Sequence, residues 1–408
     1  MKKCELLVPA GGERQFIAAV ENGADAVYVG GKLFNARINA GNFDDKELTD
    51  AVDFAHKRGV KVYVTMNTLI ADDEMKKALE YVLFLYEIGV DALIVQDVGL
   101  GAVIRENLPD FPLHLSTQGS VYDLRGVQMA GRLGYERVVL ARELSFGEIK
   151  EICQNTEVEI EVFVHGALCI CYSGQCQMSR YFGGRSGNRG ECAQPCRLPY
   201  KSFDEDGRLV KTFQHPLSPK DLCLIDHIGE LAEAGVASLK IEGRMKSAYY
   251  IATLIKTYRM LIDEIYAEGG RLSDKRMEWY YNELAKAENR PTGCGFYEGM
   301  PTYHAHLYGV NGAGVTQEFI AYVLDYEEES GMATLEVRNN FRGHIAAEVF
   351  GPTISATRFE LQELYDMDGN LLDVAKTPMQ KIRTHVPLRL EKDAMIRKVV
   401  TRNRSGIY

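Results

Sequence analysis

The sequence predicts an α/β fold: a (β/α)8 barrel of the TIM type, followed by a small C-terminal antiparallel β-barrel domain. The first observation is a sequence pattern that recurs along residues 1–245. In each copy a helix-like stretch ends at a glycine and a short apolar run follows. A glycine in this position is typical of a helix C-cap that leads directly into a buried parallel strand. Five copies indicate repeated αβ units. Their glycines are Gly23, Gly59, Gly89, Gly134 and Gly235.

The second observation is the number of strands. Most of the apolar runs are separated by roughly 10 to 20 residues with helical periodicity, such as Asp45–Lys57 and Glu74–Ile88. Eight strands that alternate with helices are typical of a (β/α)8 barrel. The predicted strands are Leu6–Pro9, Ala26–Val29, Lys61–Thr65, Ala92–Gln96, Leu113–Thr117, Arg137–Ala141, Ile160–Val164 and Ser238–Glu242.

An open, doubly wound sheet is the alternative fold. Such sheets usually carry a glycine-rich fingerprint, G-x-G-x-x-G, after the first strand. Neither the stretch from Pro9 to Gly12 nor the stretch from Gly99 to Ile104 matches this pattern. We therefore favour the barrel.

The pattern changes after the barrel, which we place at residues 1–290. A helix is expected from Arg244 to about Glu268 and another over Lys275–Ala287. The glycine- and proline-containing residues 291–317 are expected to form a linker. Short alternating runs over residues 318–408 then predict the small antiparallel β-barrel. Its expected strands are Phe319–Leu324, Thr334–Arg338, Ala346–Phe350, Phe359–Tyr365 and Leu388–Leu390.

The composition is that of a soluble globular protein. Of 408 residues, 46% are hydrophobic and 25% are charged, and the formal net charge is −10. The N-terminus lacks the long apolar region of a signal peptide, and no apolar run approaches the roughly 20 residues that span a bilayer. We expect a cytoplasmic protein that does not bind membranes and, given its acidity, does not coat nucleic acids in general.

Five of the nine cysteines lie close together after the seventh predicted strand, in a segment rich in glycine and arginine. Thiols stay reduced in the cytosol, so the pattern favours metal binding over disulfides. Soft thiolate ligands select zinc or an iron–sulfur cluster, and the spacing alone does not name the metal. The alternative is a set of buried small hydrophobic residues. The five are Cys169, Cys171, Cys176, Cys192 and Cys196, with Cys223 as a later candidate.

Polar residues follow the predicted strands at the end where barrel enzymes carry out their chemistry. The ring contains several cations, which suits an anionic small molecule or a phosphate. Because the cysteine segment, residues 165–225, is an insertion after strand seven, we expect thiols and polar ring to form one site. Candidate catalytic residues are Glu161, His165, Arg142 and Glu242, and candidate substrate-binding residues are Arg37, Asn67, Gln118 and Arg244.

The cysteine segment is also basic and aromatic. Between His165 and Lys201 it contains five cations, one acid and four interleaved aromatic residues. This composition suits a nucleic acid or another anionic partner, and it makes Arg180 and Arg185 candidate substrate-binding residues. The alternative is that the arginines pair within the fold or balance an anionic metal–thiolate site. The other cations are Arg189, Arg197 and Lys201, and the aromatic residues are Tyr172, Tyr181, Phe182 and Tyr200.

The run from Glu161 to Cys169, followed after four residues by Gly174-Gln-Cys176-Gln-Met178-Ser, resembles the signature of the family named peptidase U32. The resemblance extends to Gly23–Gly30 and Ser238–Arg244, and to a C-terminal region similar to the collagenase-like C-terminal domain of that family. It covers nearly the whole chain.

The resemblance implies one of two activities. Some members of the family are described as peptidases, whereas others resemble oxygen-independent hydroxylation proteins with a 4Fe–4S cluster on four cysteines. The segment from Gly190 to Arg197 looks most like the group that converts the wobble uridine of tRNA to 5-hydroxyuridine with prephenate as oxygen donor. The resemblance thus implies a cluster, prephenate as co-substrate, a tRNA anticodon loop as partner and, for some members, a second U32-family subunit. The implied ligands are Cys169, Cys176, Cys192 and Cys196, with Cys223 as an alternative to Cys196.

A peptidase and a zinc-stabilised scaffold are the alternatives. The sequence contains neither H-E-x-x-H nor G-x-S-x-G, so two common hydrolase mechanisms lack their residues. A nucleophile pair of Cys169 and His165 would account for a peptidase but leaves the other cysteines unexplained. A zinc scaffold uses the cysteines but gives the polar ring no role.

Overall fold

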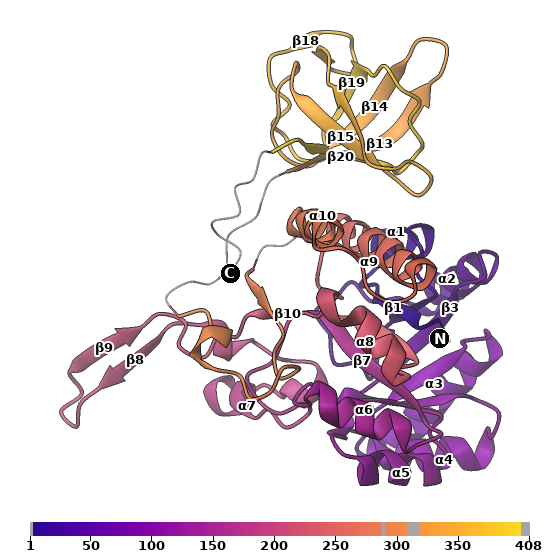
Figure 1. Ribbon diagram of the computed structural model, residues 1–408, viewed down its shortest axis with the longest axis vertical. Helices are drawn as coiled ribbons and strands as arrows, with labels where there is room; N and C mark the ends of the chain where they lie inside the picture. Colours follow the sequence, from indigo (N-terminus) through magenta and orange to yellow (C-terminus); the bar gives the residue numbers. More distant parts are fainter. Residues whose placement is uncertain (1–2, 288–289, 309–317, 401–408) are drawn as a thin grey trace. The chain divides into compact units, whose positions relative to one another are not determined.

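A computed structural model of the chain describes residues 3–287, 290–308 and 318–400. It divides into two compact units (Figure 1). The first consists of Met1–Leu284 and Arg290–Ala313, and the second of Ala285–Asn289 and Gly314–Tyr408.

The first unit is built on a closed ring of eight parallel strands. β1 (Glu5–Pro9) pairs with β2 (Ala26–Val29), and β11 (Ser238–Ile241) pairs in parallel with both β1 and β7 (Glu159–Gly166). These last two pairings close the barrel and confirm the predicted fold. The strands between β2 and β7 are β3 (Lys61–Met66), β4 (Ala92–Val95), β5 (Leu113–Leu115) and β6 (Arg137–Val139).

Helices surround the barrel (Figure 1). The recurring sequence pattern predicted helices that end at a glycine. The five repeat glycines all have a positive φ, between 72° and 102°, a conformation that favours glycine at a helix end. Asp44 and Glu47 form a capping box at the start of α2. The helices are α1 (Glu13–Glu21), α2 (Asp45–His56), α3 (Met75–Glu87), α4 (Val98–Asn107), α5 (Leu124–Arg132), α6 (Phe146–Gln154), α8 (Ile228–Ala234), α9 (Ala248–Glu268) and α10 (Asp274–Ala285).

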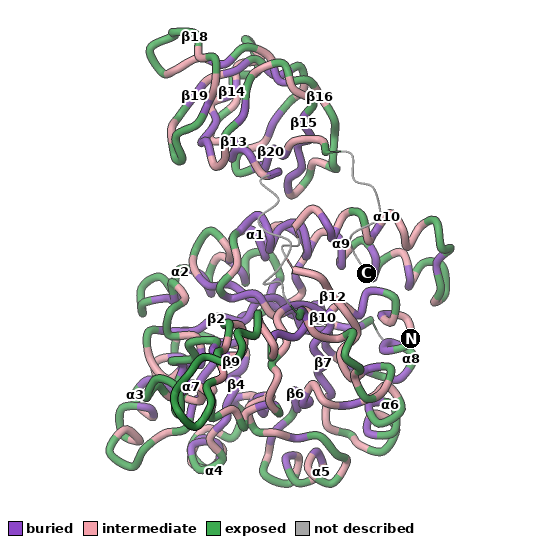
Figure 2. The backbone as a smooth tube through the Cα atoms, turned by 90° about the vertical axis from the view of Figure 1, so that its left-hand side faces the viewer, coloured by how far each residue is buried: buried purple, intermediate pink, exposed green. Residues whose placement is uncertain are grey.

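The barrel strands are the most deeply buried part of the first unit, as the purple segments of Figure 2 show. Tyr28, Tyr63 and Ile94 pack together inside the ring. One irregularity affects the site. Lys240 on β11 lies opposite Phe163 on β7, but the next residue, Ile241, lies opposite His165. Val164 is therefore an extra residue, and this β-bulge changes the face to which His165 points.

The insertion between β7 and β11 begins with the cysteine segment. It contains the short helix α7 (Met178–Gly183) and a hairpin of β8 (Tyr200–Phe203) and β9 (Leu209–Phe213), which extends away from the barrel (Figure 1). The chain then returns as β10 (Asp221–Cys223), which pairs with the end of β7.

The linker expected at residues 291–317 instead packs, in its first part, on this insertion. β12 (Thr292–Gly293) pairs in parallel with β10, and the amide of Leu307 donates a hydrogen bond to the carbonyl of Ser218. Backbone pairing therefore makes the described residues up to 307 part of the first unit. Residues 309–317 lie outside the described residues.

The second unit contains an eight-stranded antiparallel sheet with its own core, which includes Ile320, Leu335 and Ile396. Two expectations need correction. The expected strand Phe359–Tyr365 is divided because its two ends pair with different neighbours, β15 and β19. Residues 388–390 form no strand, since β19 ends earlier. The strands are β13 (Phe319–Glu327), β14 (Met332–Val337), β15 (Ala346–Phe350), β16 (Thr357–Glu360), β17 (Leu364–Tyr365), β18 (Leu371–Leu372), β19 (Lys381–His385) and β20 (Met395–Lys398).

Among the described helices, none is both long and apolar enough to cross a membrane.

Candidate functional site

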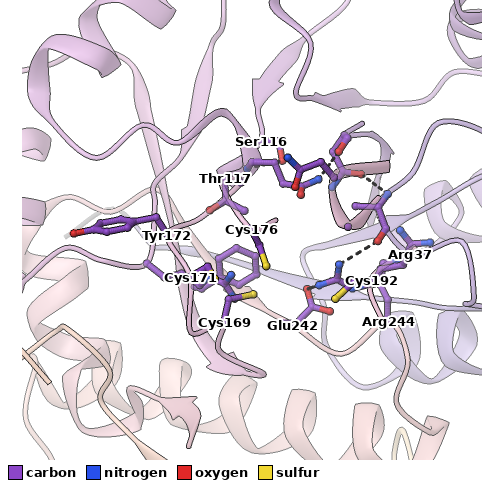
Figure 3. Close-up of a pocket in the computed structure, with 18 of the residues that line it drawn as sticks. Arg37, Ser116, Thr117, Cys169, Cys171, Tyr172, Cys176, Cys192, Glu242 and Arg244 are labelled. Carbon is purple, nitrogen blue, oxygen red and sulfur yellow. Dashed lines mark hydrogen bonds and ion pairs between the residues drawn. The ribbon is translucent and has the colours of Figure 1, made fainter. Parts of the chain in front are cut away.

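A cavity opens at the C-terminal ends of the barrel strands, and all five clustered cysteines line it. Figure 3 shows Cys169, Cys176 and Cys192 beside Glu242 and the guanidinium groups of the cavity. The polar wall comes from the loops after β2, β3, β5, β6 and β11, and the insertion supplies the thiols. The structure thus brings together Arg37, Asn67, Gln118, Arg142, Glu242, Arg244, Cys169, Cys176, Cys192 and Cys196.

The thiols differ in their electrostatic surroundings. The Arg142 guanidinium lowers the pKa of Cys169, and Arg37 adds to this effect. Burial instead raises the pKa of Cys196 to about 11, and burial also raises the pKa of Cys171. Cys169 is therefore the thiol whose ionised form the cavity stabilises.

Cys171 is not among the ligands that the resemblance implies, yet it lines the cavity with the other four cysteines. Cys223 does not line it. Cys223 lies on β10, and its sulfur is 3.9 Å from the Tyr258 hydroxyl. Within the described parts of the chain, no three His, Cys, Asp or Glu side chains are grouped so that they could hold a single metal ion.

Three arginines and one lysine make the cavity basic. Arg37 Nη2 lies 3.5 Å from a Glu242 carboxylate oxygen. Burial would raise the pKa of Glu242, but Arg37, Arg142 and Arg244 together lower it, so Glu242 remains ionised. Lys240, the fourth cation, pairs with Glu161, so three arginines against one carboxylate leave the cavity positive. A cavity of this charge can bind an anion.

Arg244 is the most deeply placed of these arginines. It donates to Thr65 Oγ1 at 3.1 Å and to Asn42 Oδ1. Burial lowers its pKa to about 10. The buried Nε atoms of Arg142 and Arg244 have no hydrogen-bond partner among the described residues. Unsatisfied buried donors of this kind are costly unless a ligand or water completes them.

Asn67 and Gln118 hold loops together at the cavity wall. The Gln118 side-chain amide donates to the carbonyl of Asn67, and Asn67 Oδ1 accepts from the amide of Ala36 at 3.0 Å. Both residues line the cavity. They connect the loops after β2, β3 and β5 and thereby define the shape of the opening.

Two candidate catalytic residues lie elsewhere. His165 does not line the cavity, because the bulge in β7 turns its side chain toward α9. Its Nδ1 is 3.2 Å from the Tyr258 hydroxyl, and its ring also contacts Tyr250. Burial lowers the pKa of His165 to about 3, so the imidazole is neutral near pH 7. Its position is that of a core residue.

Glu161 is buried inside the barrel, below the cavity. Its carboxylate accepts from Lys240 Nζ at 2.6 Å and lies 3.4 Å from Arg137 Nη1, and its side chain is 0% exposed. Glu161 is part of the family signature, whose last residues lie at the mouth of the barrel. Glu161 itself lies four residues before His165, near the opposite end of β7. It fixes Lys240, which does line the cavity.

The arginines of the insertion separate into two groups. Arg180 and Arg185 are exposed and lie outside the cavity lining, and Arg180 donates to the Gly184 carbonyl at 2.9 Å. Arg189 is held by Glu74 at 2.5 Å and by the Leu69 carbonyl at 3.0 Å. Arg197 faces Asp221 at 3.6 Å. For Arg189 and Arg197, the alternative of pairing within the fold is the correct one.

The sequence analysis missed a set of residues that fix the cysteine segment to the barrel. Glu143, after β6, accepts from the amide of Ser173 at 3.0 Å and from its hydroxyl at 3.2 Å. Asp221 pairs with Arg197 and with Arg290. No spacing in the sequence marks these contacts, because their partners come from distant segments.

The fold and the cavity define a barrel protein with a basic, thiol-lined site at the mouth of the barrel. Comparison with protein families is consistent with this class. Residues 11–306 match the model of peptidase family U32, and residues 315–397 match that of the peptidase family U32 C-terminal domain. The chain belongs to peptidase family U32.

Curated relatives of the chain include proteins with names of RNA modification. The chain is similar to tRNA hydroxylation protein P1 of Bacillus subtilis (strain 168), with 39% identity over 97% of this chain and 95% of the relative. It is similar to tRNA hydroxylation protein P of Escherichia coli (strain K12), with 31% identity over 100% of this chain and 98% of the relative. A 23S rRNA 5-hydroxycytidine synthase of the same strain is 44% identical over 68% of this chain and 43% of its own length.

Proposed function

We propose that this protein is an RNA-modifying hydroxylase and that its substrate is tRNA. The observation that carries the proposal is the match, over nearly the full length of both chains, to proteins named for tRNA hydroxylation. The match to the relative named for ribosomal RNA covers only 43% of that protein's length. RNA hydroxylation is the activity that all three names share.

The finer proposal is that the target is the wobble uridine, which becomes 5-hydroxyuridine without O2 and with prephenate as oxygen donor. The basic cavity supports a carboxylate-bearing co-substrate. Arg37, Arg142 and Arg244 line it, and a guanidinium can bind a carboxylate through two parallel hydrogen bonds. The buried, unpartnered Nε atoms of Arg142 and Arg244 are donors for which such an anion is a suitable acceptor.

We further propose that the thiols hold a 4Fe–4S cluster, through Cys169, Cys176, Cys192 and Cys196. A single zinc ion needs its ligands gathered around one point, whereas a cluster binds them through several irons. Five thiols that line one cavity provide more than the four ligands that such a cluster needs. When bound, the cluster would supply electron transfer. The chain's own residues stabilise the Cys169 thiolate through Arg142 and keep Glu242 ionised beside Arg37.

The peptidase alternative loses its proposed residue pair. Cys169 lines the cavity, whereas His165 packs against Tyr258 on the outer side of the barrel. A base that activates a nucleophile must lie within hydrogen-bond reach of it. The geometry therefore argues against a nucleophile pair of Cys169 and His165.

The exposed cations of the insertion support the proposed RNA partner. Arg180 and Arg185 lie on and just after α7, next to the exposed rings of Tyr181 and Phe182. Single-stranded RNA loops are commonly held by such combinations of stacking surfaces and cations. We propose that an anticodon loop binds here; a second U32-family subunit could complete the assembly.

The function is tested by deleting the gene and measuring 5-hydroxyuridine-derived nucleosides in bulk tRNA by mass spectrometry. The strain must lack any oxygen-dependent route to the same nucleoside. We expect the nucleoside to disappear, to return with the wild-type gene, and to stay absent with Cys169→Ala. Unchanged tRNA, together with gelatin cleavage by the pure protein, would support a peptidase instead.

The cofactor is tested separately on protein purified without air. We expect about four irons and four sulfides per chain and visible absorption from the cluster. Stoichiometric zinc in place of iron would contradict the redox chemistry but not the RNA partner.

A further inference from the structure

The hairpin of β8 and β9 is an arm with little support from the rest of the protein. Its strands pair only with each other, in antiparallel register from Tyr200–Phe213 to Phe203–Leu209. All of β9 is exposed, whereas β8 alternates between half-buried and exposed residues, and much of the arm is green in Figure 2. An isolated two-stranded hairpin is only marginally stable in water.

The arm exposes large apolar side chains. Phe203 is 58% exposed, Leu209 54%, Val210 66% and Phe213 39%. Three cations lie among them and are also exposed: Lys201, Arg208 and Lys211. Lys211 Nζ lies 5.1 Å from the centre of the Phe213 ring. Each strand therefore carries one lysine next to aromatic or aliphatic side chains, with Lys201 on β8 and Lys211 on β9.

The arm continues directly into the rim of the cavity. The ring of Tyr200, at the base of β8, packs edge-on against Phe182 of α7, with 5.7 Å between centroids. The Tyr200 hydroxyl donates to the carbonyl of Pro195 at 3.0 Å, and Pro195 lines the cavity. Tyr181 is 83% exposed and Phe182 is 65% exposed. An aromatic strip thus extends from the cavity along α7 to the arm.

We propose that this strip binds the single-stranded RNA that flanks the modified nucleotide, with bases stacked on its rings and phosphates held by Lys201 and Lys211. We define the strip as Tyr181, Phe182, Tyr200, Lys201, Phe203, Lys211 and Phe213. The strand pairing places Tyr200, Lys211 and Phe213 on one face of the arm and Lys201 and Phe203 on the other, so the RNA would contact both faces. The inference rests on the proposed function. It adds the location of the RNA outside the cavity. Aromatic side chains with interleaved cations are the usual platform for single-stranded nucleic acids, because every base has a face that can stack.

The positive and negative charges of the arm are separated along its length. The chain as a whole has a net charge of −10, yet the strip itself contains two lysines and no acid. The acids of the arm, Asp204, Glu205 and Asp206, are confined to its tip. A polyanion can therefore lie along the body of the arm and stop short of the tip.

The test compares two double variants with wild type. One is Lys201→Gln with Lys211→Gln, and the other is Phe203→Ser with Phe213→Ser. The probe is unmodified tRNA transcript, titrated by fluorescence anisotropy at several salt concentrations. For the lysine variant we expect the slope of log affinity against log salt to decrease by about 1.4, since each single-strand phosphate contact contributes roughly 0.7. For the phenylalanine variant we expect about tenfold weaker binding or more, with little change in slope.

The matched control is Lys376→Gln with Lys392→Gln, two exposed lysines of the second unit. It removes the same charge and should leave both slope and affinity as in wild type. Lys201→Arg with Lys211→Arg should restore binding. Iron content and melting temperature, measured on each variant, should stay at wild-type values, because none of the four substituted residues lines the cavity.

Three results would overturn the inference. If both arm variants bind tRNA as wild type does, while wild type hydroxylates tRNA, the arm is not an RNA surface and the proposed function stands. If they change only the sedimentation behaviour of the free protein, the arm is an interface with a second protein chain. If wild type neither binds nor modifies tRNA, the proposed function fails, and the arm inference fails with it.

Discussion

Arg197 connects the two ends of the cysteine segment. Its Nη2 donates to the carbonyl of Leu168, which precedes Cys169, at 3.3 Å. Its Nη1 faces Asp221 on β10, and these two side chains are only 13% and 7% exposed. Asp221 also accepts from Arg290 at 3.0 Å. Since Arg197 directly follows Cys196, these contacts fix the last of the four proposed ligands relative to the first.

We predict that Asp221→Asn destabilises the protein and reduces its iron content. The substitution leaves two largely buried guanidinium groups without their carboxylate, a loss that typically costs about 3 kcal/mol or more. Urea unfolding and iron analysis of anaerobic protein would measure both effects. Asp206→Asn, at the exposed tip of the arm, is the control and should change neither. Normal stability in Asp221→Asn would show that Asp221 does not hold the segment.

Four of the cavity thiols and Cys223 make a second set of residue predictions. Cys169→Ala, Cys176→Ala, Cys192→Ala and Cys196→Ala should each lose the cluster. Cys223→Ala should retain it, because Cys223 lies beside Tyr258 and outside the cavity. Iron and sulfide content of protein prepared without air distinguishes them. Cluster loss in Cys223→Ala, with retention in Cys196→Ala, would show that the fourth ligand is misassigned.

His165 predicts a pH dependence of stability. Burial lowers its pKa to about 3 from an ordinary 6.5, so below pH 6.5 the unfolded chain binds a proton that the folded protein does not. Stability is therefore complete above pH 6.5 and decreases as the pH falls, by about 2 kcal/mol between pH 7 and pH 5. In His165→Gln this part of the slope should vanish in urea titrations. Buried His114 has a lowered pKa as well and retains its own share. An unchanged slope would contradict the assignment.

Among the elements, β7 shows both what the sequence can predict and where prediction ends. Its existence and position follow from an apolar run between two helix-like stretches, and the repeat glycines locate most other strands in the same way. Simple alternation would turn Glu161, Phe163 and His165 to one face. The first two do face the barrel interior. The bulge at Val164 turns His165 outward, and a single extra residue in a strand pairing leaves no pattern in one sequence.

The buried charges inside the barrel make an element-scale prediction. Glu161→Gln removes the carboxylate that pairs with Lys240, and the buried ammonium then lacks its partner, at a cost of about 3 kcal/mol. Adding Lys240→Met should recover much of that loss, since an apolar pair of similar volume needs no counter-charge. Urea unfolding of the single and double variants measures the coupling. A single variant as stable as wild type would contradict this role and reopen a catalytic one for Glu161.

For the whole molecule, composition and periodicity were sufficient to predict two domains and to place the cysteines over the mouth of the barrel. They were not sufficient for residues 291–307, which the sequence shows as a loop but which pair with β10 and the insertion. The contacts that hold the cysteine segment, such as Glu143 with Ser173, also escaped prediction. They join segments distant in sequence, and one sequence alone contains no signal for a contact of that kind.

The two units have separate cores, and this predicts two responses to metal removal. The cavity belongs to the first unit, whereas the second has a core of its own around Ile320, Leu335 and Ile396. In calorimetry, chelation of the iron should lower the melting temperature of one transition and leave the other unchanged. Cys169→Ala should reproduce the chelated profile. A single transition that shifts as a whole would show that the units unfold together.

β11 closes the barrel, and it is also the last barrel strand to leave the ribosome. It carries Lys240, and Glu242 and Arg244 directly follow it, so part of the cavity wall is made after all five clustered cysteines. Until β11 is made, the nascent chain has unpaired edges on β1 and β7. The five cysteines are therefore synthesised before the last residues of the cavity wall. The proposed cluster would therefore meet the finished site only once translation has passed the closing strand.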